Sequence, residues 1–407
     1  MNSGNLNLHH QIFPLDNPSI LINTINMKNE LDTDHCVVTS QEACEALGVS
    51  RDTLYAYVSR GLLRAAAHPS DARKSLYDRR DVAELSQRKS RGRSRRAVAE
   101  STINWGEPVL TSKITRIEDG RFYYRGQDAV LFSEQASLED ALALLAGAGG
   151  KTMPRMPNGF EIPDTRLPFN RVMGILANEA ISDRLSDGRP RAAQLLRMAG
   201  LCAAGRYEPS DAPVHEVIAG AWSADAAAPD LIRRALVLCA DHELNASAYT
   251  ARVAASAGAS LPAALLAGIA SLSGAQHGGM TSRCRDFFNR MGDGLSVDWR
   301  QQYKLDGKPP PGFGHPLYPD GDPRSIELTR HCPVSPVWRR IEEQVIAETG
   351  AHPTIDYALA NMEIQLALPE GAGMGLFAAG RMAGWIAHIF EQRQTGQLIR
   401  PRAAPGG

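Results

Sequence analysis

Residues 241–280 read DHELNASAYTARVAASAGASLPAALLAGIASLSGAQHGGM and carry the clearest structural signal in the chain. The small, uncharged side chains of residues 254–270 predict a pair of buried helices that pack closely. Ser, Gly and Pro interrupt this apolar run, which is therefore too short to span a bilayer. His242 lies between two carboxylates at the start of the segment. His277 precedes two glycines near its end, where the missing Cβ atoms let a ligand or a backbone approach.

The composition is that of a globular protein with more than one folding unit. The chain has 407 residues, and a single hydrophobic core stops growing near about 250–300 residues. Hydrophobic residues make up 43% and charged residues 22%, which is ordinary for a globular chain. The net charge is −1, yet residues 37–100 hold 13 Lys and Arg against 8 Asp and Glu. This local excess of positive charge favours a polyanionic partner for that region alone.

The six cysteines are scattered and form no CxxC pair. Most stand beside apolar residues, as Cys239 does in LVLCA, which is typical of buried, reduced thiols. This spacing argues against a disulfide framework and against a zinc site, and the histidines do not have the spacing of a zinc motif. The first residues lack a basic region followed by an apolar core, so no signal peptide is expected. We therefore expect a cytoplasmic protein without a bound metal.

Residues 37–86 have the pattern of a compact helix-turn-helix module. Thr39 and Glu42 have the spacing of a capping box, and Gly48 is placed to end the first helix. Ser50 is placed to cap a second helix. A hairpin is expected around residues 69–71, followed by a third helix. The residues that this hairpin is expected to pair are Leu62, Leu63, Leu76 and Tyr77.

The pattern TLYAYVSRGLL, a basic loop and SLYDRRDVAEL together resemble a MerR- or excisionase-type winged helix. In that family the second helix enters the major groove of DNA and the wing contacts the backbone. The residues that the resemblance places at DNA are Arg51, Thr53, Tyr57, Arg73 and Lys74. The alternative is a small adaptor or partner-docking module whose arginines are simply solvated.

Composition separates this module from its flanks. Residues 1–36 are rich in Asn with sparse apolar residues, which is typical of a disordered leader. Residues 87–104 form a basic linker whose charges either contact phosphates without sequence preference or are solvated. The rest of the chain, 105–407, reads as one larger region. It begins with a predicted hairpin at 110–124 that turns at residues 118–120, and helical periodicity dominates from Ser137 onward.

Seven polar side chains of this larger region form a candidate site: His242, His277, His315, Asp356, Arg324, Arg381 and Arg400. Arginines bind the carboxylates of an anionic substrate through paired hydrogen bonds. Neutral histidines can donate to a carbonyl oxygen that gains negative charge, and an aspartate can act as a general base. One base and two carbonyl donors are the minimum needed to condense an enolised acyl thioester with a 2-oxo acid.

Each of these residues also has a structural interpretation. Asp356 lies two residues after Thr354 and has the position of a helix N-cap. His277 has the position of a helix-end residue, and its two glycines would then form a C-cap. The arginines would be ordinary surface charges. Taken one at a time, these residues do not favour the functional interpretation over the structural one.

Several separated segments resemble the citrate synthase family and follow its order. They are DHELNAS (241–247), AQHGGM (275–280), GFGHPLYPDGDPR (312–324), HPTIDYALA (352–360), LFAAGRMAGWIAH (376–388) and LIRPR (398–402). The resemblance implies a mainly α-helical fold of a large and a small domain, preceded here by the winged-helix module. The small domain, roughly residues 245–355, would be inserted in the large one.

The resemblance also implies roles for individual residues. Asp356 is expected to remove the acetyl proton, His277 to donate to the thioester oxygen, and His315 to polarise the oxo group of oxaloacetate. The residues implied to hold the oxaloacetate carboxylates are His242, Arg324, Arg381 and, from the other subunit of a homodimer, Arg400. Hydrolysis of a citryl thioester would complete the reaction, with acetyl-CoA as co-substrate and no further cofactor.

These expectations favour a citrate synthase, with two alternatives. One is 2-methylcitrate synthase, which takes propionyl-CoA, because one methylene in an acyl pocket is worth only about 1–3 kcal/mol. The other is a DNA-binding regulator that uses the synthase-like body as a metabolite sensor. Retention of Asp356 together with His277 and His315 favours catalysis, because a sensor needs no base aimed at a C–H bond.

Overall fold

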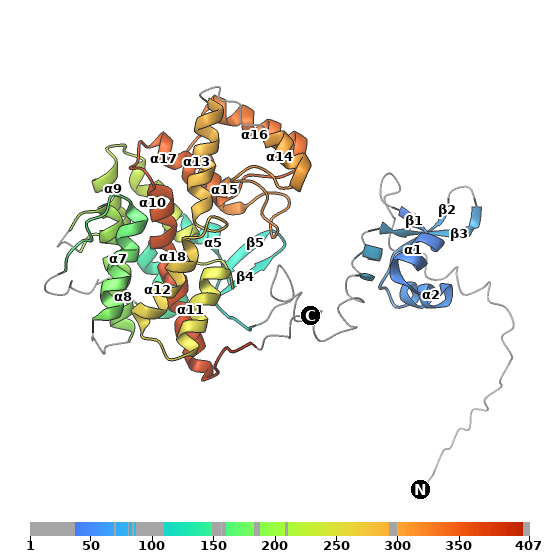
Figure 1. Cartoon of the computed structure of the whole chain (residues 1–407), viewed down its shortest axis with the longest axis horizontal. Helices are drawn as coiled ribbons and strands as arrows, with labels where there is room; N and C mark the ends of the chain where they lie inside the picture. Colours follow the sequence, from blue (N-terminus) through green and yellow to red (C-terminus); the bar gives the residue numbers. More distant parts are fainter. Residues whose placement is uncertain are drawn as a thin grey trace, which may run out of the picture. The chain divides into compact units, whose positions relative to one another are not determined.

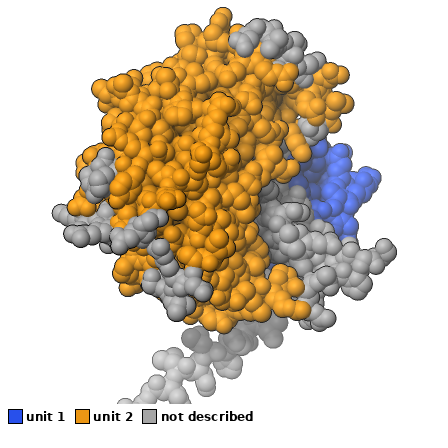
Figure 2. Space-filling view, turned by 60° about the vertical axis from the view of Figure 1, so that its left-hand side comes forward, with its two compact units in different colours: residues 1–109 blue, residues 110–407 orange. Residues whose placement is uncertain are grey.

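The computed structural model divides the chain into two compact units (Figure 1). We call the first unit, Met1–Val109, the head and the second, Leu110–Gly407, the body (Figure 2). The described residues are 37–68, 71–79, 81–83, 85–86, 110–148, 156, 160–182, 188–207, 211–292 and 299–401. The predicted leader 1–36 and linker 87–104 lie outside them, and the predicted domain limits stay predictions.

The head encloses one small hydrophobic core between two helices and a sheet. The helices are α1 (Ser40–Leu47) and α2 (Arg51–Ser59). The strands β1 (Val37–Thr39), β2 (Ala65–His68) and β3 (Asp71–Asp78) pair antiparallel in the order β1-β3-β2. The buried core residues are Val38, Ala43, Leu47, Leu54, Leu63, Tyr77 and Val82.

The predicted helix ends of the head are confirmed. Thr39 and Glu42 form a capping box, in which Thr39 N donates to Glu42 Oε2 at 2.8 Å and Glu42 N donates to Thr39 Oγ1 at 3.3 Å. Gly48 ends α1 in the left-handed region with φ 58°, which glycine adopts at little cost. Ser50 Oγ caps α2 by accepting from Thr53 N at 3.4 Å.

The hairpin of the head differs from its prediction on one side. Leu76 pairs with Ala66 of β2, whereas Leu62 and Leu63 precede the strand. The reason is that Leu62 still belongs to the C-terminal turn of α2, where its N–H donates to Tyr57 O at 2.9 Å. Leu63 turns into the head core instead of joining the sheet.

The body begins with the predicted hairpin. Strands β4 (Thr115–Glu118) and β5 (Arg121–Tyr124) pair antiparallel, and β6 (Gln127–Asp128) pairs with β5. The turn residues Asp119 and Gly120 have φ of 51° and 70°, as a two-residue turn matching the twist of the strands requires. Tyr124 anchors this sheet to the helices by donating its hydroxyl proton to Val237 O at 2.9 Å.

Helices make up most of the described part of the body, as predicted. In chain order they are α5 (Ala129–Ser133), α6 (Leu138–Ala146), α7 (Pro168–Ile181), α8 (Arg189–Ala204), α9 (Val214–Trp222), α10 (Ala228–Leu238), α11 (Ala246–Ser256), α12 (Leu261–Leu272), α13 (Gly279–Gly292), α14 (Trp299–Asp306), α15 (Pro323–His331), α16 (Pro336–Thr349), α17 (Ile355–Gln365) and α18 (Ala372–Thr395). The predicted buried pair is α11 and α12, which pack on each other. No helix in the described part of the chain combines the length and the apolar content that a membrane crossing requires.

Two hydrophobic cores lie within the body. The larger is mainly aliphatic and surrounds α18, which packs against α6, α7, α8, α10, α11 and α12 (Figure 1). The smaller is aromatic, and in it Phe288 of α13 stacks on Trp338 of α16 with ring centres 4.1 Å apart. α17 belongs to both, because Ile355 lies in the larger core and Tyr357 in the smaller. α11 and α12 also pack in the larger core. The limits of 245–355 for a small domain stay a prediction.

Candidate active site

Six of the seven predicted site residues of the body gather in one place: His242, His277, His315, Arg324, Asp356 and Arg381. Burial lowers the pKa of all three histidines, and the positive charge of Arg324 lowers each of them further. For two of them, His277 and His315, the pKa falls to about 4. These lowered pKa values keep the imidazoles neutral at neutral pH.

His242 lies in the turn between α10 and α11 and faces a histidine from a distant loop. Its ring centre is 5.1 Å from that of His315, with the two rings nearly perpendicular. Its Nε2 is 2.8 Å from the hydroxyl of Tyr318. The next residue, Glu243, has φ 51° and accepts a hydrogen bond from Ile117 N at 3.1 Å. This tight turn, tied to β4, holds the imidazole of His242 in the interior.

His277 lies in the loop between α12 and α13. Its Nε2 is 2.9 Å from Ser247 Oγ of α11, and Phe377 of α18 packs edge-on against its ring. The two glycines that follow lead into α13, so their interpretation as a helix C-cap is wrong. A Cβ on Gly278 would lie 2.8 Å from Leu272 O. Close backbone packing therefore requires glycine here, whereas neither glycine has a positive φ.

His315 lies on a loop that pairs with the segment leading into α17. Phe313 forms an antiparallel bridge with Pro353, which brings this loop beside Asp356. The backbone N–H of Leu317 donates to His315 Nδ1 at 3.2 Å. A neutral His315 that accepts at Nδ1 carries its proton on Nε2, and that nitrogen is then a hydrogen-bond donor.

Asp356 lies in the first turn of α17, and its interpretation as a helix N-cap is wrong because Thr354 is the cap residue. Thr281 of α13 donates its hydroxyl proton to Asp356 Oδ1 at 2.6 Å. Desolvation by the surrounding protein raises the pKa of Asp356 to about 6, although the Thr281 hydrogen bond and Arg324 act in the opposite direction. A carboxylate with a raised pKa is a stronger general base at neutral pH.

Arg324 is buried in the first turn of α15 and is held by a carboxylate. Its Nε and Nη2 donate to the two oxygens of Asp322 at 2.9 and 2.7 Å. Asp322 Oδ2 also accepts from Ile355 N at 2.9 Å, which ties the arginine to the start of α17. The pair fixes the guanidinium plane relative to Asp356.

Arg381 lies in the middle of α18 and is 1% exposed. Its Nε donates to Cys239 O at 2.7 Å, and its guanidinium lies over the ring of Phe377. Its Nη2 has no hydrogen-bond partner among the described residues. Buried polar groups are nearly always satisfied, so this nitrogen marks a place where an anionic ligand fits.

Arg400 does not join the other six residues within its own subunit. It is exposed on the extended segment after α18. That segment is held away from the site by Ile399 N, which donates to Ser256 Oγ at 3.0 Å. A contribution of Arg400 across a dimer stays a prediction.

Four residues that sequence reasoning passed over complete the site: Tyr318, Ser247, Thr281 and Asp322. Three of them stand inside the quoted motifs DHELNAS and GFGHPLYPDGDPR, and Thr281 directly follows AQHGGM. Proximity to a motif histidine was the only available signal. Hydroxyl residues are too common beside histidines for that signal to single them out.

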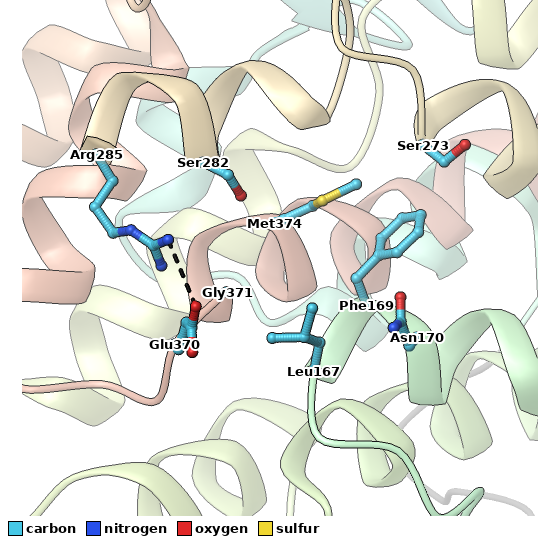
Figure 3. A pocket seen from close by; sticks show the side chains of 9 residues that line it. All are labelled: Leu167, Phe169, Asn170, Ser273, Ser282, Arg285, Glu370, Gly371 and Met374. Atoms are coloured by element: carbon cyan, nitrogen blue, oxygen red, sulfur yellow. Dashed lines mark ion pairs between the residues drawn. The ribbon is translucent and has the colours of Figure 1, made fainter. Parts of the chain in front are cut away.

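A separate cavity of about 230 Å³ opens beside the residues that flank the His277 loop (Figure 3). It is lined by Leu167, Phe169, Asn170, Ser273, Ser282, Arg285, Glu370, Gly371 and Met374. Arg285 pairs with Glu363 at 2.7 Å and lies 3.8 Å from Glu370. Its charge is thus neutralised by protein carboxylates, unlike that of Arg381, and none of the predicted site residues lines this cavity.

The candidate DNA contacts of the head are unequally exposed. Arg51 at the start of α2 is exposed, and the side chain of Lys74 on β3 is 72% exposed. Thr53 is engaged at the start of α2, where its Oγ1 lies 3.0 Å from Ser50 Oγ. The side chain of Arg73 lies outside what the structure describes.

The two tyrosines of α2 point in different directions. Tyr57, the predicted contact, packs against the head core. Tyr55, which the prediction passed over, is 54% exposed. Arg60 after the end of α2 is also exposed. The outer surface of α2 therefore combines Arg51, Tyr55 and Arg60.

The cysteines of the described residues are all free: Cys44, Cys202, Cys239, Cys284 and Cys332. Cys36 lies outside the described residues. In the same part of the chain, no three His, Cys, Asp or Glu side chains are placed to hold a metal ion.

Comparisons with known proteins give two family matches. The family described as "Citrate synthase, C-terminal domain" matches residues 179–402, and "Helix-turn-helix domain" matches residues 37–90. Citrate synthase 2 of Bacillus subtilis is 34% identical over 185 residues, which cover 43% of this chain and 50% of that protein. 2-Methylcitrate synthase 1 of Corynebacterium glutamicum is 33% identical over 186 residues, covering 43% and 49%. The chain thus spans about half the length of the curated relatives it matches.

Solved structures agree in fold. The crystal structure of citrate synthase from Thermotoga maritima has a TM-score of 0.62 at 22% identity, covering 74% of this chain and 94% of that one. The ternary complex of citrate synthase from Thermoplasma acidophilum with carboxymethyl coenzyme A and oxaloacetate has a TM-score of 0.60 at 22% identity, with the same coverage. The predicted mainly α-helical fold and both predicted resemblances are confirmed.

Proposed function

Since the chain belongs to the citrate synthase family, we propose that it condenses acetyl-CoA with oxaloacetate to form citrate and CoA. The observation that carries this proposal is the buried Arg381, whose Nη2 lacks a partner among the described residues. A substrate carboxylate satisfies that nitrogen. Around it stand three neutral histidines and one carboxyl group of raised pKa.

Asp356 is the base of the proposed reaction. At neutral pH its carboxylate, with a pKa of about 6, takes a proton from the methyl group of the acetyl thioester. The electrons of the broken C–H bond move onto the thioester oxygen, to which His277 donates a hydrogen bond.

The enol carbon then attacks the oxo carbon of oxaloacetate. His315 donates from Nε2 to the oxo oxygen as it gains negative charge. This oxygen takes up one proton to become the hydroxyl of the product, which balances the proton that Asp356 removed from the methyl group. His242, Arg324 and Arg381 hold the two carboxylates, and Asp322 keeps Arg324 oriented. Water hydrolyses the resulting citryl thioester, so that the carbon–sulfur bond breaks and CoA leaves as its thiol.

A propionyl-CoA reaction giving 2-methylcitrate is the closest alternative. Relatives named citrate synthase and relatives named 2-methylcitrate synthase match this chain at similar identity. The two substrates differ by one methylene, which an acyl pocket distinguishes by only about 1–3 kcal/mol. The ratio of kcat/KM for acetyl-CoA and propionyl-CoA decides between them.

A thiol-release assay with oxaloacetate and each thioester tests the proposal on the full chain. We expect CoA release by the unaltered protein and a loss of about 10²–10⁴-fold in Asp356→Ala, the range that a general base contributes. Asp320→Asn, which changes an exposed aspartate of the 312–324 segment, is the matched control and should retain full activity. Absence of release with both thioesters, or equal rates in the unaltered and Asp356→Ala proteins, would contradict the proposal.

The assembly and location of the protein are also proposals. Arg400 is exposed and absent from the site of its own subunit, which suits a homodimer in which it reaches the partner's site. Free cysteines throughout the described residues suit the reducing cytoplasm. Sedimentation of the full chain tests for the dimer. Oxaloacetate binding by Arg400→Ala tests whether Arg400 contributes to the site, and it should be weaker than in the unaltered protein. A monomer with undiminished activity would contradict it.

DNA binding by the head is a second proposed function, favoured by the match of residues 37–90 to a helix-turn-helix family. The outer surface of α2 and the wing present exposed cations and one exposed aromatic ring: Arg51, Tyr55, Arg60 and Lys74. An electrophoretic mobility-shift assay of the full chain against fragments of genomic DNA tests it. A shift without any citrate formation would favour the regulator that senses a metabolite. No shift at low salt would favour an adaptor.

A further inference from the structure

A buried pair next to the proposed site has no part in the reaction described above. Asp241 directly precedes His242 and is fully buried, as is His388 of α18. His388 Nε2 lies 3.2 Å from Asp241 Oδ1, and Thr115 donates its hydroxyl proton to Asp241 Oδ2 at 2.5 Å. Removing a carboxylate from water costs several kcal/mol unless partners compensate. Its two partners therefore determine how this carboxylate is placed.

One face of α18 holds the chain that leads into His242. Arg381 donates to Cys239 O at 2.7 Å, and Gly384 N donates to Ala240 O at 2.9 Å. His388 approaches the next residue along, Asp241. A Cβ on Gly384 would lie 2.4 Å from Ala240 O, so only glycine allows this approach. Three consecutive residues are thus held by α18 immediately before the histidine of the site.

The pair also bears on Arg381. Burial lowers the pKa of Arg381, and the negative charge of Asp241 acts against that effect, so the two side chains lie within electrostatic reach. Yet Arg381 Nη2 has no hydrogen-bond partner among the described residues. The Asp241 carboxylate instead accepts the Thr115 hydroxyl proton at Oδ2 and lies with Oδ1 3.2 Å from His388 Nε2. Without His388, its carboxylate would compete with a ligand carboxylate for Arg381.

We propose that Asp241 and His388 are a positioning pair that fixes His242 and keeps Arg381 available for a carboxylate of the 2-oxo acid substrate. The pair touches neither substrate nor the reacting atoms. Its identification with oxaloacetate binding rests on the proposed function. Loss of the pair should weaken binding of the 2-oxo acid and leave binding of the thioester largely unchanged, because His242 and Arg381 both belong to the proposed carboxylate site.

Substitutions of His388 in the full chain test this pair against a matched control. His388→Leu removes the contact, and His388→Gln keeps an amide that can donate to Asp241. Gln392→Met is the control, because Gln392 lies one turn further along α18, is 2% exposed and accepts from Arg252 Nε at 2.9 Å. It thus loses an equally buried polar contact on the same helix.

We expect His388→Leu to raise the Kd and the KM for oxaloacetate about tenfold or more, with the KM for acetyl-CoA within about twofold. His388→Gln should recover most of this loss. Gln392→Met should lower the melting temperature and leave the Kd for oxaloacetate unchanged. The Kd comes from titration calorimetry and the KM values from thiol release.

An unchanged Kd for oxaloacetate in a folded His388→Leu protein, or an equal rise in Gln392→Met, overturns the proposal. If His388→Leu does not fold, Thr115→Val takes its place, because it removes the hydrogen bond to Asp241 Oδ2, and an unchanged Kd for oxaloacetate in folded Thr115→Val overturns the proposal. An unaltered protein that binds oxaloacetate without releasing CoA defeats the proposed function alone, and the Kd values still decide the role of the pair. An unaltered protein that does not bind oxaloacetate defeats both.

Discussion

The arginines of the head and of the body differ in how deeply they are buried. Arg51 and Arg60 of the head are exposed, whereas Arg324 and Arg381 of the body are 2% and 1% exposed. An exposed cation attracts phosphate weakly and is screened by salt. A buried guanidinium has lost its hydration and needs a fixed partner. Arg324 has one in Asp322, whereas Nη2 of Arg381 has none within the part of the chain that the structure describes. Within one chain, the exposed arginines are therefore suited to weak, salt-screened attraction, and the buried arginines to a fixed partner.

The largest expected effect comes from removing the buried, partly unsatisfied guanidinium. Arg381→Leu should weaken oxaloacetate binding by about 30-fold or more, because truncating one partner of a buried charge pair costs about 2–5 kcal/mol. Titration calorimetry measures this Kd. Arg330→Leu is the control, since Arg330 forms an ion pair with Glu327 while its own side chain is 64% exposed, and its Kd should stay within about twofold. Equal losses in both proteins would break the comparison between buried and exposed arginines.

The pH dependence of catalysis tests the effect of burial on a second charged group of the body, Asp356. Its pKa of about 6 means that the carboxylate needed as base is protonated below that pH. The value of kcat/KM should therefore fall about tenfold for each pH unit below 6 and be level above it. His277 and His315, with a pKa of about 4, should add no inflection between pH 5 and 8. A pH–rate profile with its inflection near 4, the ordinary value for an aspartate, would show that the site does not desolvate this carboxyl.

Smaller effects are expected at the exposed cations of the head. A plot of log affinity for duplex DNA against log salt concentration has a negative slope. Arg51→Ala and Lys74→Ala should each make this slope shallower by about one, which is the contribution of one phosphate contact. Fluorescence anisotropy at several salt concentrations measures this slope. Neither change should alter the Kd for oxaloacetate. An unchanged slope in both variants would remove α2 and the wing from the DNA contact.

The smallest effect is expected from deleting residues 1–100. The head and the body form separate compact units with their own cores, so kcat and both KM values should remain within about twofold. Circular dichroism shows whether the truncated chain is folded, and thiol release measures its rate. Complete inactivity of a folded truncated chain would contradict the division of labour between the two units.

Local signals in the sequence predicted local structure well. The capping box of Thr39 and Glu42, the stop at Gly48 and the turn at Asp119–Gly120 all form as expected. The pairing of Leu62 failed, because hydrophobic pattern alone does not show where a helix end finishes and a strand begins. Element boundaries depend on tertiary packing as well as on propensity.

The site was predictable as a set of residues and not as a geometry. Six of the predicted residues gather in the structure, and they could be predicted because they stand in recognisable motifs. The contacts that tune them join distant parts of the chain, as Thr281 does to Asp356 and Cys239 to Arg381. That Arg381 Nη2 has no partner among the described residues depends on where the carboxylate of Asp241 is held. No spacing in the sequence encodes it.

The most direct test of the account follows the fate of the acetyl carbon. The full chain is incubated with oxaloacetate and acetyl-CoA labelled with ¹³C in its methyl group, and the products are identified by NMR. The account predicts labelled citrate, with the label in a methylene carbon and one CoA released for each citrate formed. Labelled acetate in place of citrate, or no turnover of the thioester, would contradict a site in which Asp356 and two imidazoles form a carbon–carbon bond.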